Sequence, residues 1–157
     1  MTIATAVRRR ADCTGRRVGA VMVRDRHIVS TGYNGTPEGL PNCSEGGCRR
    51  CADRERYPSG TGYDLCICVH AEQNALLQAA RFGIAVEGST LYTTMRPCFG
   101  CTKELLQARV REVIYLDDWA HPDPEHQAEY ERLQAAFPGG IRRLELREPA
   151  PAPDLPL

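Results

Sequence analysis

The central part of the chain begins with Cys66-Ile67-Cys68-Val69-His70-Ala71-Glu72 and ends with Pro97-Cys98-Phe99-Gly100-Cys101. Cys98 and Cys101 stand three residues apart, so on a helix they share one face and can bind one metal ion. Pro97 suits the first turn of a helix, where exposed amide groups favour the thiolate form that a metal needs. His70 offers a third ligand from another segment. Two sulfurs and one imidazole predict a catalytic zinc site with an open fourth position.

Glu72 follows His70 by two residues, so on a helix its side chain points in a different direction and is not expected to bind the same ion. We expect it beside the open position, where zinc lowers the pKa of water to about 7. A carboxylate there can take a proton from water and return protons to a ring nitrogen and a leaving ammonia. The order H-x-E and then P-C-x-x-C is the signature of zinc deaminases that act on nucleobases. The alternative is a structural zinc site of the zinc-finger kind.

Length and composition narrow the class of protein. At 157 residues the chain is most simply one domain, with 20 basic and 20 acidic side chains. This balance argues against nucleic acid or an acidic membrane surface as a partner. No apolar run is long enough to span a membrane, and the N-terminus lacks a signal-peptide core. The sequence therefore predicts a cytoplasmic protein, in which eight cysteines indicate metal binding rather than disulfides.

Hydrophobic periodicity and turn signals predict alternating strands and helices. Asn34-Gly35 is expected to form a tight turn after a hairpin. The expected elements are a weak helix at 2–12 with Ile3 facing inward, strands at 18–23 and 27–33, a helix at 70–82 with Leu77 and Ala80 on its apolar side, a strand at 90–94, a helix at 98–108, a short buried parallel strand at 112–116, a helix at 125–137 and a last strand at 141–146. This order predicts one α/β domain at 1–147, a mixed sheet with helices on both faces. Residues 148–157 are rich in proline and are expected to be a disordered tail.

The segment at about 36–69 interrupts this pattern with glycine, proline and cysteine. A loop of this length needs something to hold it in a compact domain. Six cysteines outside the catalytic motif are candidates, namely Cys13, Cys43, Cys48, Cys51, Cys66 and Cys68. Four thiolates would close a structural zinc site, and the sequence leaves open which four of the six bind. The alternative is that these cysteines are free thiols.

Four segments together resemble the deoxycytidylate (dCMP) deaminases. They are Val18-Gly19-Ala20, Thr31 to Pro37 (Thr-Gly-Tyr-Asn-Gly-Thr-Pro), His70 to Ala75 (His-Ala-Glu-Gln-Asn-Ala) and Pro97 to Cys101 (Pro-Cys-Phe-Gly-Cys). The resemblance covers roughly residues 13 to 120. It implies a three-layer α/β/α fold with a central five-stranded mixed sheet, as in the cytidine deaminase-like superfamily. It also implies zinc-dependent hydrolysis of dCMP to dUMP and ammonia, which supplies dUMP for thymidylate synthesis.

The resemblance also assigns roles to residues. It implies that His70, Cys98 and Cys101 bind zinc, that Glu72 moves protons and that Asn34 contacts the deoxyribose. Some relatives carry a second, structural zinc, and Cys13 and Cys43 stand where those relatives have ligands. Family members are commonly homo-oligomers, most often hexamers, with dCTP as activator and dTTP as inhibitor.

Three points stay open at the level of sequence. Ala71 and Trp119 are candidates for the base pocket, and Arg24, Arg26 and Arg96 are candidates for the substrate phosphate, because guanidinium groups match phosphate well. Other deaminations remain possible, with another cytosine nucleotide or nucleoside or a tRNA adenosine as the substrate. A competence-operon protein is similar over the same motifs, so a non-catalytic zinc scaffold is a further alternative. An RNA substrate is disfavoured because the chain has no basic stripe with stacking aromatic residues.

Overall fold

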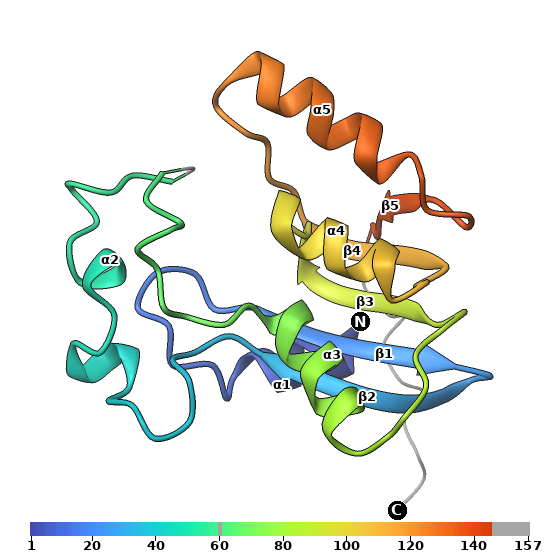
Figure 1. The fold of residues 1–157 in the computed structure, drawn as a ribbon. Helices are drawn as coiled ribbons and strands as arrows, with labels where there is room; N and C mark the ends of the chain where they lie inside the picture. The colour runs from blue at the N-terminus through green and yellow to red at the C-terminus, as the bar shows by residue number, and fades with distance from the viewer. Residues whose placement is uncertain (60, 146–157) are drawn as a thin grey trace, which may run out of the picture.

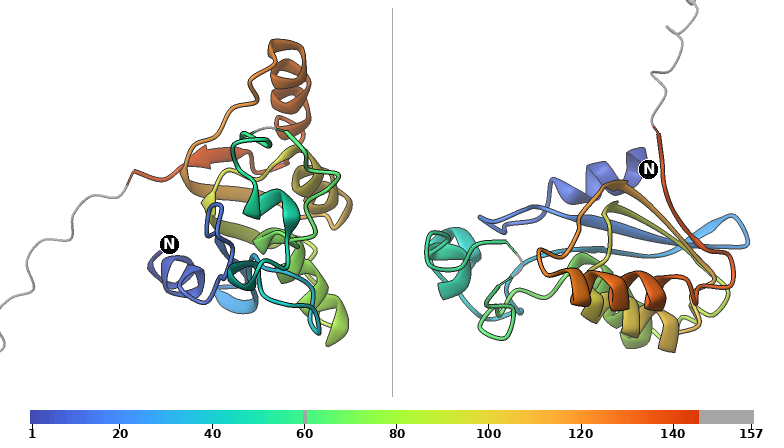
Figure 2. Two further views of the ribbon diagram at one scale, coloured as in Figure 1. Left: turned by 90° about the vertical axis from the view of Figure 1, so that its left-hand side faces the viewer. Right: turned by 90° about the horizontal axis from the view of Figure 1, so that it is seen from above.

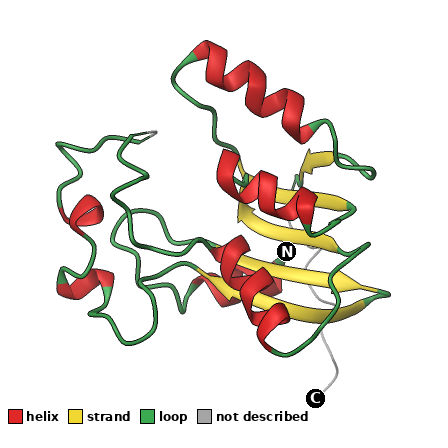
Figure 3. Cartoon of the chain, in the orientation of Figure 1, coloured by secondary structure: helices red, strands yellow, loops and turns green. Residues whose placement is uncertain are grey.

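The computed structural model describes residues 1–59 and 61–145, and the predicted tail at 148–157 lies outside them. The chain forms a five-stranded sheet in the order β2-β1-β3-β4-β5 (Figures 1 and 3). β1 pairs antiparallel with both β2 and β3, whereas β3, β4 and β5 run parallel. The sheet is therefore mixed, as predicted. The strands are β1 (Gly19–Arg24), β2 (His27–Tyr33), β3 (Thr90–Met95), β4 (Glu112–Asp117) and β5 (Ile141–Arg143).

Helices cover both faces of the sheet, so the domain has three layers (Figure 2). α1 (Thr2–Arg8) packs on one face, against β1, β2 and β3. α3 (Ala71–Arg81), α4 (Phe99–Gln107) and α5 (Pro124–Gln134) lie on the other face. The predicted α/β/α architecture is confirmed.

The segment from 36 to 69 projects from one end of the sheet (Figure 1). Its regular structure is limited to a 3₁₀ turn, η1 (Cys43–Glu45), and a single helical turn, α2 (Arg49–Ala52). The cysteines that the sequence singled out lie in and beside these two turns. None of the described helices has both the length and the apolar character needed to cross a membrane.

The hairpin turns at Asp25 and Arg26, which both have positive φ (50° and 64°). The predicted tight turn at Asn34-Gly35 is wrong, because neither residue adopts positive φ. Gly35 instead pairs with Val69, and the two residues exchange backbone hydrogen bonds of 3.2 Å and 2.8 Å. This bridge brings the end of β2 beside the residues that precede α3.

A close approach at Gly32 sets the position of α3 on the sheet. A Cβ atom at Gly32 would lie 2.1 Å from the Ala71 carbonyl oxygen, so only glycine lets the first turn of α3 sit directly on β2. Ser30 reinforces the contact, because its hydroxyl donates a 2.6 Å hydrogen bond to the Ala75 carbonyl. The N-terminus of α3, which carries His70 and Glu72, is therefore held by backbone packing.

The buried core lies between the sheet and the α3–α4 layer. Its members are mostly small or aliphatic side chains from β1, β3, β4, α3 and α4, including Ala20, Met22, Ala71, Ala75, Leu91, Leu105 and Val113. Two predicted inward faces are wrong in detail. α1 buries Ala4 and leaves Ile3 53% exposed. α3 buries its alanines at 71, 75 and 79, which share the face toward the sheet, whereas Leu77 points away from that face and is 59% exposed, and Ala80 is exposed too.

Candidate active site and metal centres

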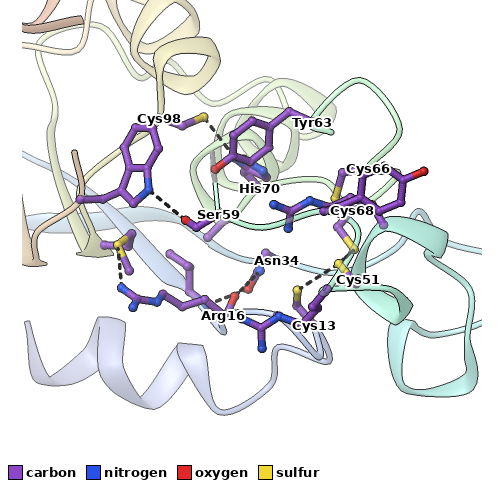
Figure 4. Close-up of a pocket in the computed structure, with 18 of the residues that line it drawn as sticks. Cys13, Arg16, Asn34, Cys51, Ser59, Tyr63, Cys66, Cys68, His70 and Cys98 are labelled. Atoms are coloured by element: carbon purple, nitrogen blue, oxygen red, sulfur yellow. Dashed lines mark hydrogen bonds between the residues drawn. The ribbon is translucent and has the colours of Figure 1, made fainter. Parts of the chain in front are cut away.

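The catalytic motif is assembled at the N-termini of two neighbouring helices. His70 is the N-cap residue of α3, and Cys98 is the N-cap residue of α4. Gln73 fixes the start of α3, because its Oε1 accepts a 2.9 Å hydrogen bond from the His70 amide and its Nε2 donates to Glu104 of α4. The helices therefore present both motif segments to the same space, as Figure 4 shows for His70 and Cys98.

His70, Cys98 and Cys101 form a set of metal ligands. The His70 Nδ1 atom lies 3.3 Å from the Cys98 sulfur and 3.4 Å from the Cys101 sulfur. Zn–S distances of about 2.3 Å and Zn–N distances of about 2.0 Å give a tetrahedral N···S edge of about 3.5 Å. The three side chains fit zinc, and His70 would bind through Nδ1.

The electrostatic environment of Cys98 and His70 also suits metal binding. Hydrogen bonds from Cys101 and His70 lower the pKa of Cys98 to about 4, and Cys98 in turn raises the pKa of His70 to about 9. These shifts favour the thiolate form of Cys98, which is the form that binds a metal. Zinc would displace the imidazolium proton of His70, as ligand binding requires.

Glu72 is buried beside these ligands, with 4% of its surface exposed. Burial raises the pKa of its carboxyl, and the neighbouring His70 opposes that rise. Its Oε1 accepts a 2.8 Å hydrogen bond from the hydroxyl of Thr93, a fully buried residue of β3. Thr93 was not predicted from the sequence. Its one sequence signal is a polar hydroxyl on the inward face of a strand whose other residues on that face are apolar.

The Pro97 carbonyl is held from α5. The Tyr130 hydroxyl and the Gln134 amide both donate to this carbonyl, and both side chains are buried. Two side chains of α5 therefore stabilise the Pro97–Cys98 turn, although α5 contains no residue of the motif.

A cavity of about 490 Å³ opens in front of this site, and it is lined by His70, Ala71, Glu72, Cys98, Asn34 and Trp119. Glu72 and the residues predicted to contact the sugar or the base thus line one cavity. A second hollow of about 460 Å³ also reaches His70 and Cys98 but does not include Glu72. The first cavity is the candidate substrate pocket, because Glu72 lines it together with the ligands His70 and Cys98, whereas Glu72 does not line the second.

Asn34 is buried and already bonded to the backbone. Its Oδ1 accepts from the Val18 amide at 2.7 Å, and its Nδ2 donates to the Arg16 carbonyl at 2.8 Å. An amide has further capacity for one donated and one accepted bond. Contact of Asn34 with a sugar therefore stays a prediction.

Trp119 stands between the two hollows. Its indole N–H donates to the Ser59 hydroxyl at 3.4 Å, and its ring meets Tyr130 edge to face. The ring therefore lines the pocket and ties the projecting segment to the rest of the domain.

Of the three arginines considered for a phosphate, only Arg96 lines the pocket. Its guanidinium is engaged by Gln134 and Asp118 and lies over the Tyr130 ring, so it holds α5 in place. Arg24 and Arg26 lie in the hairpin, away from the pocket lining. The other arginines that line it are Arg16, Arg50 and Arg54, and none of these three was predicted from the sequence.

The six remaining cysteines come together in one group, which we call the six-cysteine cluster: Cys13, Cys43, Cys48, Cys51, Cys66 and Cys68. Two overlapping sets of four have all their sulfurs within 4.8 Å of one another. One set is Cys13, Cys43, Cys51 and Cys68, and the other is Cys48, Cys51, Cys66 and Cys68. Either set matches the donors of a structural zinc site.

The thiols of the cluster influence one another strongly. Hydrogen bonds from Cys68 lower the pKa of Cys13 and of Cys66 to about 5. Burial and the charge of Cys13 raise the pKa of Cys51. Two thiolates thus form readily, and further ionisation requires a compensating cation.

Residues 1–117 match the family model of the cytidine and deoxycytidylate deaminase zinc-binding region. A deoxycytidylate deaminase of Schizosaccharomyces pombe is 43% identical over 115 residues, which are 73% of this chain and 35% of that protein. The chain thus spans about a third of the length of this yeast relative. A deoxycytidylate deaminase of Mycobacterium phage D29 is 41% identical over 116 residues, which are 72% of this chain and 88% of the phage protein.

The solved structures agree with this match. A dCMP deaminase from the cyanophage S-TIM5, in complex with dCMP and dUMP, superposes with a TM-score of 0.66 at 26% identity. The superposition covers 91% of this chain and 92% of the phage chain. It confirms the cytidine deaminase-like fold, and the chain belongs to the cytidine and deoxycytidylate deaminase family.

Proposed function

We propose that this protein hydrolyses dCMP to dUMP and ammonia, and so supplies dUMP for thymidylate synthesis. The observation that carries the proposal is Glu72, a buried carboxylate next to three zinc ligands at the floor of a nucleotide-sized cavity. The phage enzyme that superposes over most of its length was solved with dCMP and dUMP, which supports the same substrate here. The buried acid argues against a non-catalytic scaffold, which has no use for it.

Zinc held by His70, Cys98 and Cys101 would supply the water-activating chemistry of an open tetrahedral site. Glu72 does the proton transfers. Its raised pKa makes it a better base toward water than an exposed carboxylate, and the same group then serves as the acid for N3 of the cytosine and for the departing amine. Thr93 fixes the orientation of the carboxylate through its hydrogen bond to Oε1.

The pocket also offers a site for the 5′-phosphate. Arg16, Arg50 and Arg54 line it on the side of the projecting segment. Arg50 is occupied, because it donates to the carbonyls of Thr61 and Pro58 and stacks on Tyr63. Among the described residues Arg54 has no ion pair or hydrogen-bond partner from its side chain. We assign phosphate binding to Arg54, with Arg16 beside it.

The test compares ammonia release from dCMP, dCTP, deoxycytidine and tRNA under the same conditions. Turnover should be highest with dCMP by at least about tenfold, a difference of about 1.4 kcal/mol in transition-state binding. Glu72→Gln should keep its zinc, measured by elemental analysis, and lose at least about 10² in kcat because the proton transfers are removed. Equal turnover in that variant, or a preference for another of the four substrates, refutes the proposal.

Regulation and assembly form part of the same proposal. A homo-oligomer, most simply a hexamer, with dCTP as activator and dTTP as inhibitor, follows from the family resemblance. Exposed apolar side chains on and after α3 support self-association, among them Leu77, Phe82 and Ile84. Light scattering gives the oligomer number, and a dCMP titration with each triphosphate tests the regulation. We assign the protein to the cytoplasm, where reduced cysteines serve metal binding.

A further inference from the structure

The six-cysteine cluster joins four parts of the chain that are separate in sequence. Cys13 follows α1, Cys43 begins η1, and Cys48 and Cys51 flank the first residues of α2. Cys66 and Cys68 precede the catalytic His70. Five of the six side chains are buried, and Cys66 is half-buried. Figure 4 shows Cys13, Cys51, Cys66 and Cys68 grouped beside the substrate pocket.

The distances between sulfurs match zinc coordination. Cys13 and Cys51 lie 3.8 Å apart, Cys51 and Cys68 lie 3.9 Å apart, and Cys48 and Cys66 lie 3.8 Å apart. A Zn–S distance of about 2.3 Å gives a tetrahedral S···S edge of about 3.8 Å. A disulfide would bring two sulfurs to about 2.05 Å, so these are not disulfide geometries.

The two sets of four share Cys51 and Cys68. Two four-coordinate ions need eight ligand positions, and six cysteines supply them when two thiolates each bind both ions. The pattern of shared and unshared sulfurs is the one that such a site requires. Cys13 and Cys43 belong to one set only, and Cys48 and Cys66 belong to the other.

A single ion explains the arrangement less well. If the ion occupied the set with Cys13 and Cys43, the fully buried Cys48 would remain as an unligated thiol 3.8 Å from Cys66. If it occupied the other set, the buried Cys13 and Cys43 would be left over. Either choice leaves two sulfurs at ligand distance from the shared pair with no ion to bind.

The surroundings offset the charge of such a site. Two zinc ions and six thiolates carry a net charge of −2, and residues 49–56, with four arginines and two acidic residues, carry a net charge of +2. The Thr14 amide and hydroxyl both lie 3.5 Å from the Cys43 sulfur, and N–H···S and O–H···S contacts stabilise a thiolate ligand.

We propose that the six-cysteine cluster binds two zinc ions, with the thiolates of Cys51 and Cys68 bridging them. Cys13 and Cys43 complete one site, and Cys48 and Cys66 complete the other. The cluster fixes α2, from which Arg50 donates to the carbonyls of Thr61 and of Pro58, and Pro58 lines the pocket. Because metal binding to such a segment is part of its folding energy, the two ions order the projecting segment.

The first test is the zinc content of the purified full chain under reducing conditions. We expect three zinc ions per chain, one at His70, Cys98 and Cys101 and two in the cluster. The exposed group His121, Asp123 and His126 is the one other described set with metal-ligand spacing, so His126→Ala serves as the control for adventitious zinc. Three ions in both proteins support the proposal. Two ions in either protein overturn it.

The second test uses the unmodified chain loaded with ¹¹³Cd and correlates cysteine Hβ protons with cadmium by NMR. We expect two cadmium signals from all-sulfur sites, each coupled to four cysteines, and the Hβ protons of Cys51 and Cys68 coupled to both. A single all-sulfur signal, or two signals that share no cysteine, overturns the proposal. This measurement needs no variant and no enzymatic activity, so it is independent of the proposed dCMP deamination.

A third test compares the zinc content of variants in which one ligand of either proposed ion is replaced. Cys43→Ser and Cys48→Ser should each lower the zinc content by one ion, and the double variant should lower it by two. If the cluster held one ion, one of these single variants would keep the wild-type content. The count is made on the fraction that elutes as folded protein, and the cadmium spectrum of the unmodified chain decides the outcome where a variant does not fold.

Discussion

The Thr93 hydroxyl donates a 2.8 Å hydrogen bond to the Glu72 carboxylate, and both groups are shielded from water. Among the described residues, Thr93 is the one side chain that donates to this buried carboxylate, so the orientation of the carboxylate depends on that bond. Thr93→Val keeps the shape of the side chain and removes the bond, which for a charged acceptor contributes about 1.5–3 kcal/mol. We expect kcat for dCMP to fall by about 10–100-fold with little change in KM, because the loss falls on the proton transfers.

Steady-state kinetics and zinc content check this prediction. Thr93→Ser retains the hydroxyl and should recover most of kcat, whereas a purely packing role would make serine worse than valine. Thr90→Val, which removes a hydroxyl at the start of the same strand, is the control and should leave kcat unchanged.

Arg54→Gln tests the phosphate site. Loss of a guanidinium that binds phosphate should raise KM for dCMP about tenfold, the effect of about 1.4 kcal/mol of binding energy. The kcat/KM for deoxycytidine, which lacks the phosphate, should not change. Arg56→Gln is the matched control, because Arg56 is near in sequence but does not line the pocket. An equal loss with both substrates would show that Arg54 acts on the structure of the segment instead.

Tyr130→Phe tests the support of the Pro97–Cys98 turn from α5. The Pro97 carbonyl keeps only the longer bond from Gln134, at 3.3 Å, so we expect a loss of about 0.5–1.5 kcal/mol in the free energy of unfolding. Zinc should also leave the catalytic site faster in the presence of a chelator. Tyr92→Phe is the control, because the Tyr92 hydroxyl has no hydrogen bond to any part of the chain that the structure describes. Identical denaturation curves for Tyr130→Phe and wild type would contradict the assignment.

Gly32→Ala tests the contact between β2 and α3. The added methyl group would meet two backbone atoms, the Ala71 oxygen at 2.1 Å and the Ala75 nitrogen at 2.4 Å. Overpacking of this kind costs about 1–3 kcal/mol or more, and the displaced α3 carries His70 and Glu72. We expect lower stability in urea denaturation together with lower kcat. Gly35→Ala, whose Cβ would meet nothing within 4 Å, should retain both, and equal behaviour of the two variants would exclude the packing argument.

Removal of metal should loosen the segment from 36 to 69. Arg49, Arg50, Arg54 and Arg56 offer tryptic sites there. We expect these bonds to resist trypsin in the loaded protein and to be cleaved after chelation, since the cluster holds the segment in place. Cys98→Ser, which removes a ligand of the catalytic zinc only, is the control and should stay resistant. The same digestion pattern with and without chelator would show that the segment does not depend on metal.

His70, Glu72, Cys98 and Cys101 could be singled out from the sequence as candidate catalytic residues because their spacing is local, and the structure places them together. His70 and Glu72 are two residues apart, Cys98 and Cys101 are three apart, and both pairs stand at strong helix starts. Strand alternation and helix periodicity likewise predicted the sheet and its three long helices. Thr93 and Arg54 could not be found in this way, because the hydrogen bond of Thr93 to Glu72 and the place of Arg54 in the pocket lining depend on how distant parts of the chain fold together.

The errors have physical causes too. Leu77 was expected to be buried, but α3 turns its alanine face toward the sheet, where the close approach of Gly32 leaves room for small side chains, and Leu77 lies on the opposite face. Asn34-Gly35 has the composition of a tight turn, yet its backbone stays extended because Gly35 pairs with Val69. The cysteines were correctly singled out as a group, but spacing alone gave no means to see that Cys51 and Cys68 lie in both sets of four.

The bridge between Gly35 and Val69 has a consequence for protein engineering. These residues mark where the projecting segment leaves the common scaffold and where it returns, and their hydrogen bonds bring its two ends together. A chimera that exchanges this segment with that of a relative should be joined at these two positions. A junction placed one residue beyond Val69 would fall on His70, the N-cap residue of α3, and would disturb the active site of the recipient protein.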